Sequence, residues 1–574
     1  MKNIFCLLKP SLLLFGIMSL AISCKNHKVQ EQKQPEYASF DWFEYKGNDP
    51  VYKELEKTPD QYLNPILAGF YPDPSMVRVG EDYYLVNSTF SYFPGIPVFH
   101  SKDLVNWEQI GNVLDRPSQL NLDSLPISYG VFAPAINFHD STFYVINTIV
   151  GRGGNFFVTA KNPAGPWSEQ TWLNEIDGID PSFFFDDNGK AYIVNNGPPV
   201  EKSLYNGHRA IWIQEFDIAS QKLTGSRKVI VNGGVDITKK PIWIEGPHLI
   251  KTQGYYYLIA AEGGTGEDHS EVVFRSKSPM GSYVPYDKNP ILTQRNLNPN
   301  RINPITCTGH ADFVETQKGE WWAVFLGCRP YESNYYNTGR ETYLMPIKWT
   351  DGWPVVTKGD ETVAYLHQRP NLSLQQTPKI PLNGNFTIKD DFSDSLLAMN
   401  WYFIRTPREK WYEISEGLLK IQARHESIDS LAKQPSFIGR RQQHAYCTAS
   451  TAMKFLPSKI GDKAGLMIFQ NEKYYYFLGL AKNEKGTIVE LEQSNNTNSK
   501  QGPKILASSK VSLPDSGEIY LKIEARGKFY DFFYALEPNN WTMLIENIDA
   551  SQLSTSKAGG FVGAFFGMYA YSVE

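Results

Sequence analysis

Apolar and polar residues alternate along most of the chain, which is the pattern of β-strands with one buried face. Between about residues 61 and 350 one pattern recurs: a proline or small residue, an apolar strand, a polar turn, and an aromatic pair that opens a second strand. Its five copies are DPSMVRVGEDYYLV, APAINFHDSTFYVI, DPSFFFDDNGKAYIV, GPHLIKTQGYYYLI and HADFVETQKGEWWAV. Each copy predicts a β-hairpin, because the turn residues stand between two strand-like runs.

Five such units in succession predict a five-bladed β-propeller. The alternative, a β-sandwich with chance internal similarity, is disfavoured because the spacing from strand start to aromatic pair is nearly constant across the copies. The innermost strand of each propeller blade lines the central axis, so equivalent positions of the repeats meet there. These positions are Asp73, Ala133, Asp180, Gly246 and His310, with Glu245 one residue earlier in the fourth copy.

The rest of the chain predicts a second β-domain. Residues 386–574 contain strand patterns from LLKIQAR to GFVGAFFGM and are about the size of one β-sandwich. Residues 368–385 are rich in proline and polar residues and are expected to be a linker. The predicted fold class is therefore all-β, with a propeller over residues 61–367 followed by a β-sandwich over residues 386–574.

The N-terminus has the pattern of an export signal. Two lysines precede the apolar stretch Leu12 to Ile22, which is too short to span a bilayer. Small residues then lead into Cys24, as in a bacterial lipoprotein signal, although ordinary cleavage near Ser23 is the alternative. We expect an exported protein, lipid-anchored at Cys24 in the bacterial cell envelope on the periplasmic or outer-membrane face. Residues 1–23 would be the signal peptide and residues 24–60 a tether and N-terminal extension.

Charge and cysteine content exclude several classes of protein. The 574 residues include 56 Lys and Arg and 61 Asp and Glu, a net charge of −5. This balance, without any basic run, argues against nucleic-acid binding. After loss of the signal, Cys307, Cys328 and Cys447 remain beside Cys24, and they show neither a disulfide framework nor C-x-x-C metal spacing. We expect these three to be buried, small apolar residues.

Three carboxylates form the strongest candidate site. They are Asp73, Asp180 and Glu245. Considered alone, each has an ordinary explanation as a turn or strand-end residue. Their shared repeat register instead predicts that they meet at one end of the propeller axis. Burial and mutual repulsion would then raise the pKa of at least one of them. A protonated acid beside an ionised base is the pair that cleaves glycosidic bonds, and in inverting enzymes the two stand roughly 6.5–9.5 Å apart with a water between.

The segment NPILAGFYPDPSMVRVGEDYYLVNSTFSYFPGIPVFHSKDLVNW resembles glycoside hydrolase family 43. The segments GIDPSFFFDDNGKAYIV, IEGPHLIKTQGYYYLIAAEGGT, CTGHADFV and GRETYLMPIKW follow in the order of that family. In the second domain DDFSD, SFIGRRQQH and GFVGAFFGMYA look like the concanavalin A-like β-sandwich that accompanies family β-xylosidases. The resemblance implies a five-bladed propeller with inverting glycosidase activity, mainly β-xylosidase or α-L-arabinofuranosidase.

The resemblance also implies roles for individual residues. Asp73 matches the general base that activates water, Glu245 matches the general acid, and Asp180 matches the carboxylate that orients the acid and raises its pKa. Arg340 matches an arginine that contacts sugar hydroxyls, although a plain partner of Glu341 is the alternative. His310 matches a central histidine that faces either the sugar or a water-shelled calcium ion. A hydrogen-bonded core histidine remains open for that position.

Three aromatic residues complete the expected site. Phe90 and Phe93 match aromatic positions near the pocket, where apolar ring faces stack on a sugar. Phe132 stands where relatives often have tryptophan, and the missing indole N–H bears on substrate preference. In the second domain, the aromatic-rich ending around Phe561 and Phe565–Phe566 permits either independent polysaccharide binding or closure of one side of the pocket. We expect the second role.

The resulting hypothesis is an exo-acting, inverting glycoside hydrolase that releases terminal xylose from β-1,4-xylo-oligosaccharides. The alternatives are an α-L-arabinofuranosidase acting on side chains of arabinoxylan or arabinan and, from another class, a non-catalytic glycan-binding lipoprotein. No cofactor is expected to be required, and a structural Ca²⁺ held through water at His310 stays open. The membrane would be contacted only through the N-terminal lipid.

Overall fold

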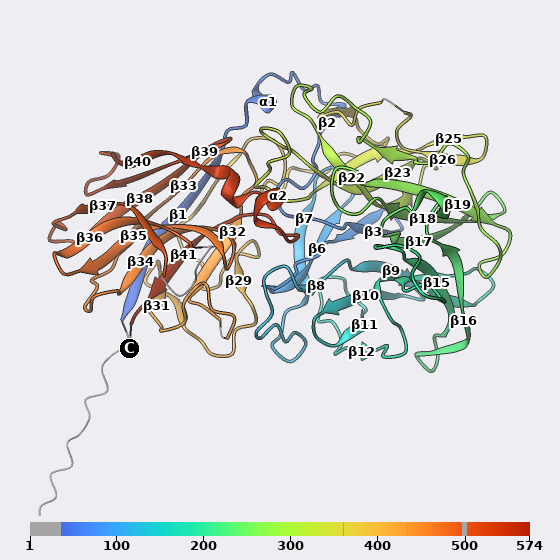
Figure 1. Cartoon of the computed structure of the whole chain (residues 1–574), viewed down its shortest axis with the longest axis horizontal. Helices are drawn as coiled ribbons and strands as arrows, with labels where there is room; N and C mark the ends of the chain where they lie inside the picture. The colour runs from blue at the N-terminus through green and yellow to red at the C-terminus, as the bar shows by residue number, and fades with distance from the viewer. Residues whose placement is uncertain (1–35, 360, 433, 496–501, 574) are drawn as a thin grey trace, which may run out of the picture. The chain divides into compact units, whose positions relative to one another are not determined.

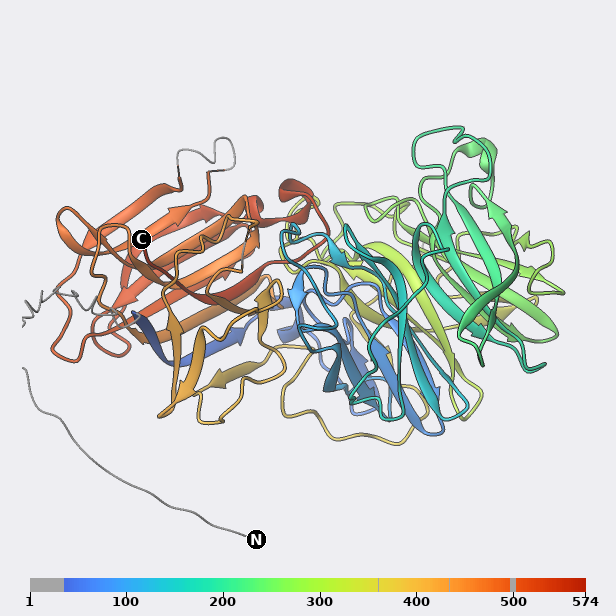
Figure 2. The ribbon, with the colours of Figure 1, turned by 90° about the horizontal axis from the view of Figure 1, so that it is seen from below.

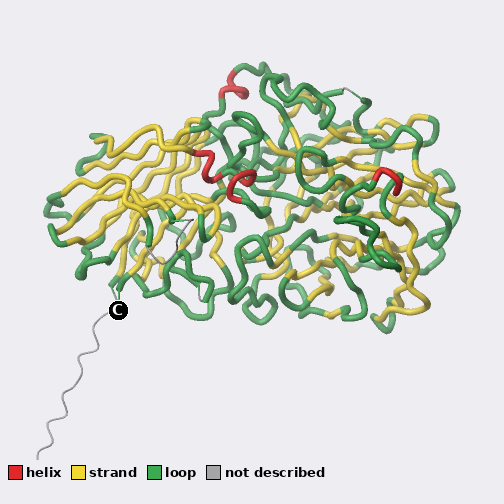
Figure 3. The backbone as a smooth tube through the Cα atoms, in the orientation of Figure 1, coloured by secondary structure: helices red, strands yellow, loops and turns green. Residues whose placement is uncertain are grey.

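The computed structural model describes residues 36–359, 361–432, 434–495 and 502–573 (Figure 1). This part of the chain is almost entirely β-structure, and Figure 3 shows helix only in short segments. These are α1 (Pro50–Lys53), η1 (Ile237–Lys239), η3 (Ala550–Leu553) and α2 (Thr555–Ala558). None of the helices in the described ranges is long and apolar enough to cross a membrane. The predicted all-β class is confirmed, while the predicted signal peptide and lipidation site, Cys24, lie outside the described residues.

Five antiparallel sheets follow one another along the propeller, and each begins with a hairpin predicted from the repeats. The first is β3 (Ser75–Val79), β4 (Asp82–Val86), β6 (Gly95–Ser101) and β7 (Glu108–Leu114). The second is β9 (Ala135–His139), β10 (Thr142–Val150), β11 (Gly154–Ala160) and β12 (Thr171–Trp172), with β8 (Gly130–Val131) also paired to β10. The third is β13 (Ile179–Phe185), β14 (Ala191–Gly197), β15 (Ala210–Asp217) and β16 (Lys222–Asn232).

The last two sheets close the ring. The fourth is β17 (Glu245–Thr252), β18 (Tyr255–Glu262), β19 (Ser270–Ser276) and β20 (Val284–Pro285), with β21 (Leu292–Thr293) on β19. The fifth is β22 (Thr306–Glu315), β23 (Trp321–Cys328) and β24 (Glu341–Pro346). The innermost strands contact one another in the cycle β3, β9, β13, β17, β22 and back to β3. This cycle is the predicted five-bladed propeller.

One short pairing joins the start of the propeller to its end: strand β2 (Gln61–Leu63) pairs with β27 (Leu366–Gln368). After the fifth blade, β25 (Lys348–Thr350) and β26 (Trp353–Val355) form a local hairpin. Leu67 forms a bridge with Thr342, and the Asn64 amide donates a hydrogen bond of 2.9 Å to the Leu344 carbonyl. The segment before the first blade therefore runs along the last strand of the fifth blade.

The second domain is a sandwich of two eight-stranded sheets. One contains β30 (Tyr412–Ser415), β31 (Leu418–Gln422), β1 (Tyr37–Gly47), β33 (Tyr446–Lys454), β38 (Glu518–Arg526), β39 (Phe529–Ala535) and β40 (Thr542–Asp549), with β28 (Thr387–Asp390) paired to β1. The other contains β37 (Lys504–Lys510), β36 (Gly486–Gln493), β35 (Tyr474–Asn483), β34 (Lys463–Asn471), β41 (Phe565–Tyr571), β32 (Phe437–Arg441), β29 (Tyr402–Ile404) and β5 (Tyr92–Phe93). The predicted β-sandwich is confirmed.

Strand β1 places part of the N-terminal extension in the sandwich. Residues 24–60 were expected to be a tether and N-terminal extension, and within them Tyr37–Gly47 pairs with β28, β31 and β33 inside a sandwich sheet. Figure 2 shows this blue strand among the orange strands of the sandwich. The strand is held there because Phe40, Phe43 and Tyr45 are buried in the sandwich core. The chain thus enters the sandwich before it builds the propeller.

The propeller and the sandwich share a sheet and a core. Strand β5, which follows the first hairpin of the propeller, pairs with β29 of the sandwich. One buried cluster joins Phe70 and Phe90 of the propeller to Phe565 and Tyr569 of the sandwich. The predicted linker has no strand after Gln368 and crosses the surface to β28. Sandwich residues therefore lie within reach of the propeller axis.

Candidate active site

A shared backbone kink marks the start of the innermost strands. Asp73, Asp180, Gly246 and His310 have φ angles of 51°, 52°, 55° and 54°. Strands β13, β17 and β22 also show a register shift at this point. Such bulges turn a side chain out of its normal strand direction, and positive φ at a residue other than glycine costs of the order of 1–3 kcal/mol. The repeat register read from the sequence therefore coincides with a strained turn that directs side chains toward the axis.

Asp73, Asp180 and His310 line a cavity of about 420 Å³ at the propeller axis. Its lining includes every residue predicted for catalysis or sugar binding except Phe93: Asp73, Phe90, Phe132, Asp180, Glu245, His310 and Arg340. All three carboxylates are buried, with at most 6% of their surface exposed. The structure thus brings together acidic residues that lie between 65 and 172 positions apart in the chain.

Phe93 is the exception among the predicted residues. It lies in β5, where it pairs with Phe403 of the sandwich, and its ring is buried in the core that both domains share. It does not line the cavity. The physical reason is that β5 is used as an edge strand of the sandwich, so its side chains pack into that core and not toward the axis.

Asp73 is held in its ionised form. Its Oδ1 accepts a hydrogen bond of 2.6 Å from Arg340 Nη1, and its Oδ2 accepts one of 2.5 Å from the Ser88 hydroxyl. Burial by itself would raise the pKa of Asp73, but the positive charge of Arg340, together with His310 and Ser88, lowers it below its usual value. A buried carboxylate that stays charged fits a general base.

The surroundings of Glu245 favour its protonated form. Burial raises its pKa well above the usual value, and the negative charges of Asp180 and Asp73 raise it further. Its buried Oε1 has no hydrogen-bond partner among the described residues. Glu245 lines the cavity, so its proton can reach a group bound there. These properties fit a general acid.

Asp180 interacts electrostatically with both of the other carboxylates. Burial, and then the charge of Asp73, raises the pKa of Asp180 to about 7, although its Oδ2 accepts a hydrogen bond of 3.2 Å from the backbone N–H of Gly246. Its charge is the largest electrostatic contribution to the raised pKa of Glu245. Asp180 therefore acts on the residue that carries the proton.

An aromatic wall closes one side of the cavity. The rings of Phe90 and Phe132 lie 4.9 Å apart between centroids, and Phe561 stacks on Phe90 at 5.8 Å. The Arg340 guanidinium lies 5.7 Å from the Phe90 ring centre and 5.8 Å from that of Phe561. Flat apolar faces beside hydrogen-bonding groups suit a sugar ring, which has apolar C–H faces and polar edges.

Phe561 comes from the sandwich. Its backbone N–H donates a hydrogen bond of 3.1 Å to the Ser128 hydroxyl of the propeller. Phe565 and Phe566, by contrast, are fully buried in β41. The sandwich therefore shapes the cavity through this one ring, in line with the expected role of the second domain.

Among the residues that sequence reasoning missed are Trp243 and Arg209. Trp243 lines the cavity, and the Arg209 guanidinium lies 4.7 Å from its ring centre. The charge of Arg209 partly offsets the raised pKa of both Asp180 and Glu245. Arg209 stands next to β15 and Trp243 next to β17, outside the repeated hairpins. No repeat position marked either residue.

His310 lies in the cavity with a neutral ring. Burial lowers its pKa to about 4, against the opposing charge of Asp73. Calcium takes six to eight oxygen ligands, and the described residues contain no group of three or more His, Cys, Asp or Glu side chains placed to hold a metal ion. A calcium ion held through water stays a prediction, and no step below depends on it.

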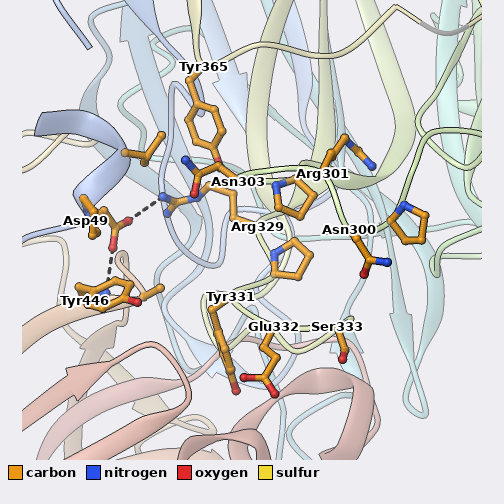
Figure 4. Close-up of a pocket in the computed structure, with 16 residues that line it drawn as sticks. Asp49, Asn300, Arg301, Asn303, Arg329, Tyr331, Glu332, Ser333, Tyr365 and Tyr446 are labelled. Carbon is orange, nitrogen blue, oxygen red and sulfur yellow. Dashed lines mark hydrogen bonds and ion pairs between the residues drawn. The ribbon is translucent and has the colours of Figure 1, made fainter. Parts of the chain in front are cut away.

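A second cavity of about 430 Å³ lies around Asp49, Arg329 and Tyr446 (Figure 4). Arg329 donates to both oxygens of Glu341, at 2.6 and 2.8 Å, and to Asp49 at 2.8 Å. Its remaining bonds go to the Tyr52 hydroxyl and to a backbone carbonyl. The buried acids Asp49 and Glu341 thus share one arginine as ion-pair partner, unlike Glu245 at the axis.

Comparisons with known proteins agree with this geometry. The model of glycosyl hydrolases family 43 matches residues 62–354, and that of the β-xylosidase C-terminal concanavalin A-like domain matches residues 389–574. A xylosidase/arabinosidase of Butyrivibrio fibrisolvens is 41% identical over 89% of this chain and 95% of its own length. The non-reducing end α-L-arabinofuranosidase BoGH43B of Bacteroides ovatus is 38% identical over 89% of this chain and 91% of its own length.

A solved structure gives the same result for the fold. The crystal structure of a GH43_12 protein from a capybara gut metagenome has a TM-score of 0.85 and 41% identity, and the match covers 94% of this chain and 100% of that one. The likeness thus extends over both the propeller and the sandwich. The chain belongs to glycosyl hydrolase family 43 and is a glycoside hydrolase of its xylosidase and arabinosidase group.

Proposed function

We propose that the protein is an exo-acting, inverting hydrolase that releases terminal xylose from β-1,4-xylo-oligosaccharides. The observation that carries the proposal is that one cavity is lined by Asp73, which is ion-paired to Arg340, and by Glu245, whose buried Oε1 has no partner among the described residues. The volume of that cavity, about 420 Å³, and the wall made by Phe561 suit one terminal sugar with the rest of the chain leading outward.

In the proposed reaction Asp73 removes a proton from a water molecule, which attacks the anomeric carbon. The bond between that carbon and the leaving oxygen breaks, and Glu245 gives its proton to this oxygen. No covalent bond forms between enzyme and sugar, so the product has the opposite anomeric configuration. Asp180 keeps the proton on Glu245 until the leaving oxygen takes it.

The choice of sugar is supported by the second domain, whose matched model is described as a companion of β-xylosidases. The second candidate is α-L-arabinofuranosidase activity, after which the Bacteroides ovatus relative is named. Measuring kcat/KM on nitrophenyl β-D-xyloside and nitrophenyl α-L-arabinofuranoside separates the two. A higher value on the xyloside supports the proposal, and a higher value on the arabinofuranoside assigns the second candidate.

The non-catalytic alternative is tested with the same protein. A wild type that binds xylo-oligosaccharide but hydrolyses none of a panel of pentosides would be a glycan-binding protein. Glu245→Gln serves as the reference, because it removes the acidic proton while keeping the shape of the side chain. We expect turnover in the wild type and binding without turnover in this variant.

We also propose that the protein is exported and lipid-anchored through Cys24, on the basis of the N-terminal sequence pattern. Mass spectrometry of the mature N-terminus tests this proposal. A diacylated or triacylated Cys24 is expected, and a free N-terminus that begins at or near residue 24 without lipid would overturn it.

A further inference from the structure

Two exposed aromatic rings lie on the second blade at the end where the active site opens. Tyr129 lines the cavity and is 46% exposed. Trp172, in β12, is 39% exposed. Single exposed aromatic residues are ordinary on protein surfaces, so the question is whether these two form one surface.

Strand pairing places both rings at the same end of the blade. Strand β10 runs toward the cavity and ends at Val150, which lines it. After a tight turn β11 runs away from the cavity, and β12 returns along it with Trp172 opposite Phe156, two residues from the start of β11. Trp172 is thus two strands outward from β10, a lateral distance of about 10 Å at an interstrand spacing of about 4.8 Å, and its register places it level with Asn147 of that strand.

The turn between β10 and β11 connects the two rings. Gly151 and Gly153 have φ angles of 83° and 85°. A methyl group added to Gly151 would lie 2.9 Å from the Tyr129 ring, and one added to Gly153 would overlap the Trp172 ring. Both rings therefore lie directly against the turn, and only glycine leaves room for them. The intervening Arg152 donates to the Asp123 carbonyl at 2.8 Å.

We propose that Tyr129, the glycine turn and Trp172 form a strip that binds the leaving-group part of a linear pentose oligosaccharide. If the terminal sugar fills the cavity, the remaining sugars must leave through its opening, and the strip leads outward from there. Flat aromatic faces bind the C–H faces of successive sugars and leave their hydroxyls in water. The inference rests on the proposed function and adds that the substrate class is oligosaccharides longer than a disaccharide.

The test compares kcat/KM on xylo-oligosaccharides from xylobiose to xylohexaose in the wild type and in Trp172→Ala. We expect the value to rise with chain length in the wild type and to fall about fivefold to tenfold on xylohexaose in the variant, through KM. Xylobiose and nitrophenyl xyloside should change less than about twofold. Trp172→Phe keeps a flat ring and should retain most of the length dependence. Tyr37→Ala removes a ring of equal exposure from β1 of the sandwich and should have no effect.

A second measurement separates this inference from the proposed function. Binding of xylohexaose and of α-1,5-linked arabinohexaose is measured by calorimetry in Glu245→Gln with and without Trp172→Ala, which requires no turnover. Weaker binding of at least one hexaose in the double variant supports the strip even where the xylosidase assignment fails. Unchanged binding of both hexaoses, or an equal loss of kcat/KM at every chain length, overturns the strip while leaving the proposed hydrolysis intact.

Discussion

Replacement of Arg340 should move the acidic limb of the pH profile. Arg340 Nη1 and Asp73 Oδ1 lie 2.6 Å apart, and each side chain is only 5% exposed. Two unit charges about 4 Å apart attract by about 4 kcal/mol at an effective dielectric of 20. One pH unit corresponds to about 1.4 kcal/mol, so even a third of this attraction shifts the limb by about one unit. Only a third of the attraction is counted, because His310 and Ser88 still favour the ionised form of Asp73 when Arg340 is lost.

The direction follows from the role of Asp73. The base must be ionised, and Arg340 lowers its pKa, so loss of the guanidinium raises that pKa and removes activity first at acidic pH. The assay compares kcat/KM of the wild type and of Arg340→Met between about pH 3 and pH 8, since this profile reports the groups of the free enzyme. Arg340→Lys keeps a positive charge and should move the limb less. A uniform loss at all pH values, with the acidic limb unmoved, would refute the reasoning.

Three further predictions concern the acid, the aromatic wall and the domain junction. Glu245→Gln should lower kcat on xylobiose by about 10²–10⁴-fold, and by much less on a dinitrophenyl xyloside, whose leaving oxygen needs no proton; an equal loss on both substrates would contradict the assignment of the acid. Phe561→Ala should raise KM severalfold with little change in melting temperature, because its ring is 36% exposed and packs on Phe90; an unchanged KM would remove the sandwich from the site. Arg329→Met should lower the free energy of unfolding by about 3–5 kcal/mol in urea titrations, since it leaves Glu341 and Asp49 buried without their counter-ion; a loss below about 1 kcal/mol would show that these acids find other partners.

The propeller could be predicted from the sequence because its information is local and repeated. Each blade carries its own alternating hairpin, and the repeat fixes which positions face the axis. The predicted meeting of Asp73, Asp180 and Glu245 needed only this register. The left-handed backbone at Asp73 and Asp180 was not visible in the sequence, because neither residue is glycine.

The parts that were missed depend on contacts between distant segments. Strand β1 has the alternation of a strand, but its partners lie more than 300 residues later in the chain. The ending around Phe561 was expected to close one side of the pocket, and its ring reaches the cavity because the sandwich shares a sheet and a core with the propeller. The same shared sheet takes Phe93 out of the pocket. Local sequence patterns predict strands and turns, whereas the packing of two domains against each other decides these positions.

The central claim is that Asp73 and Glu245 act on opposite sides of one bond without a covalent intermediate. It is tested most directly by following the first product of nitrophenyl β-xyloside hydrolysis by proton NMR before mutarotation. The account predicts that α-xylose forms first and that the β-anomer grows in later. Initial formation of β-xylose would mean retention of configuration and would contradict the assigned roles of the two carboxylates.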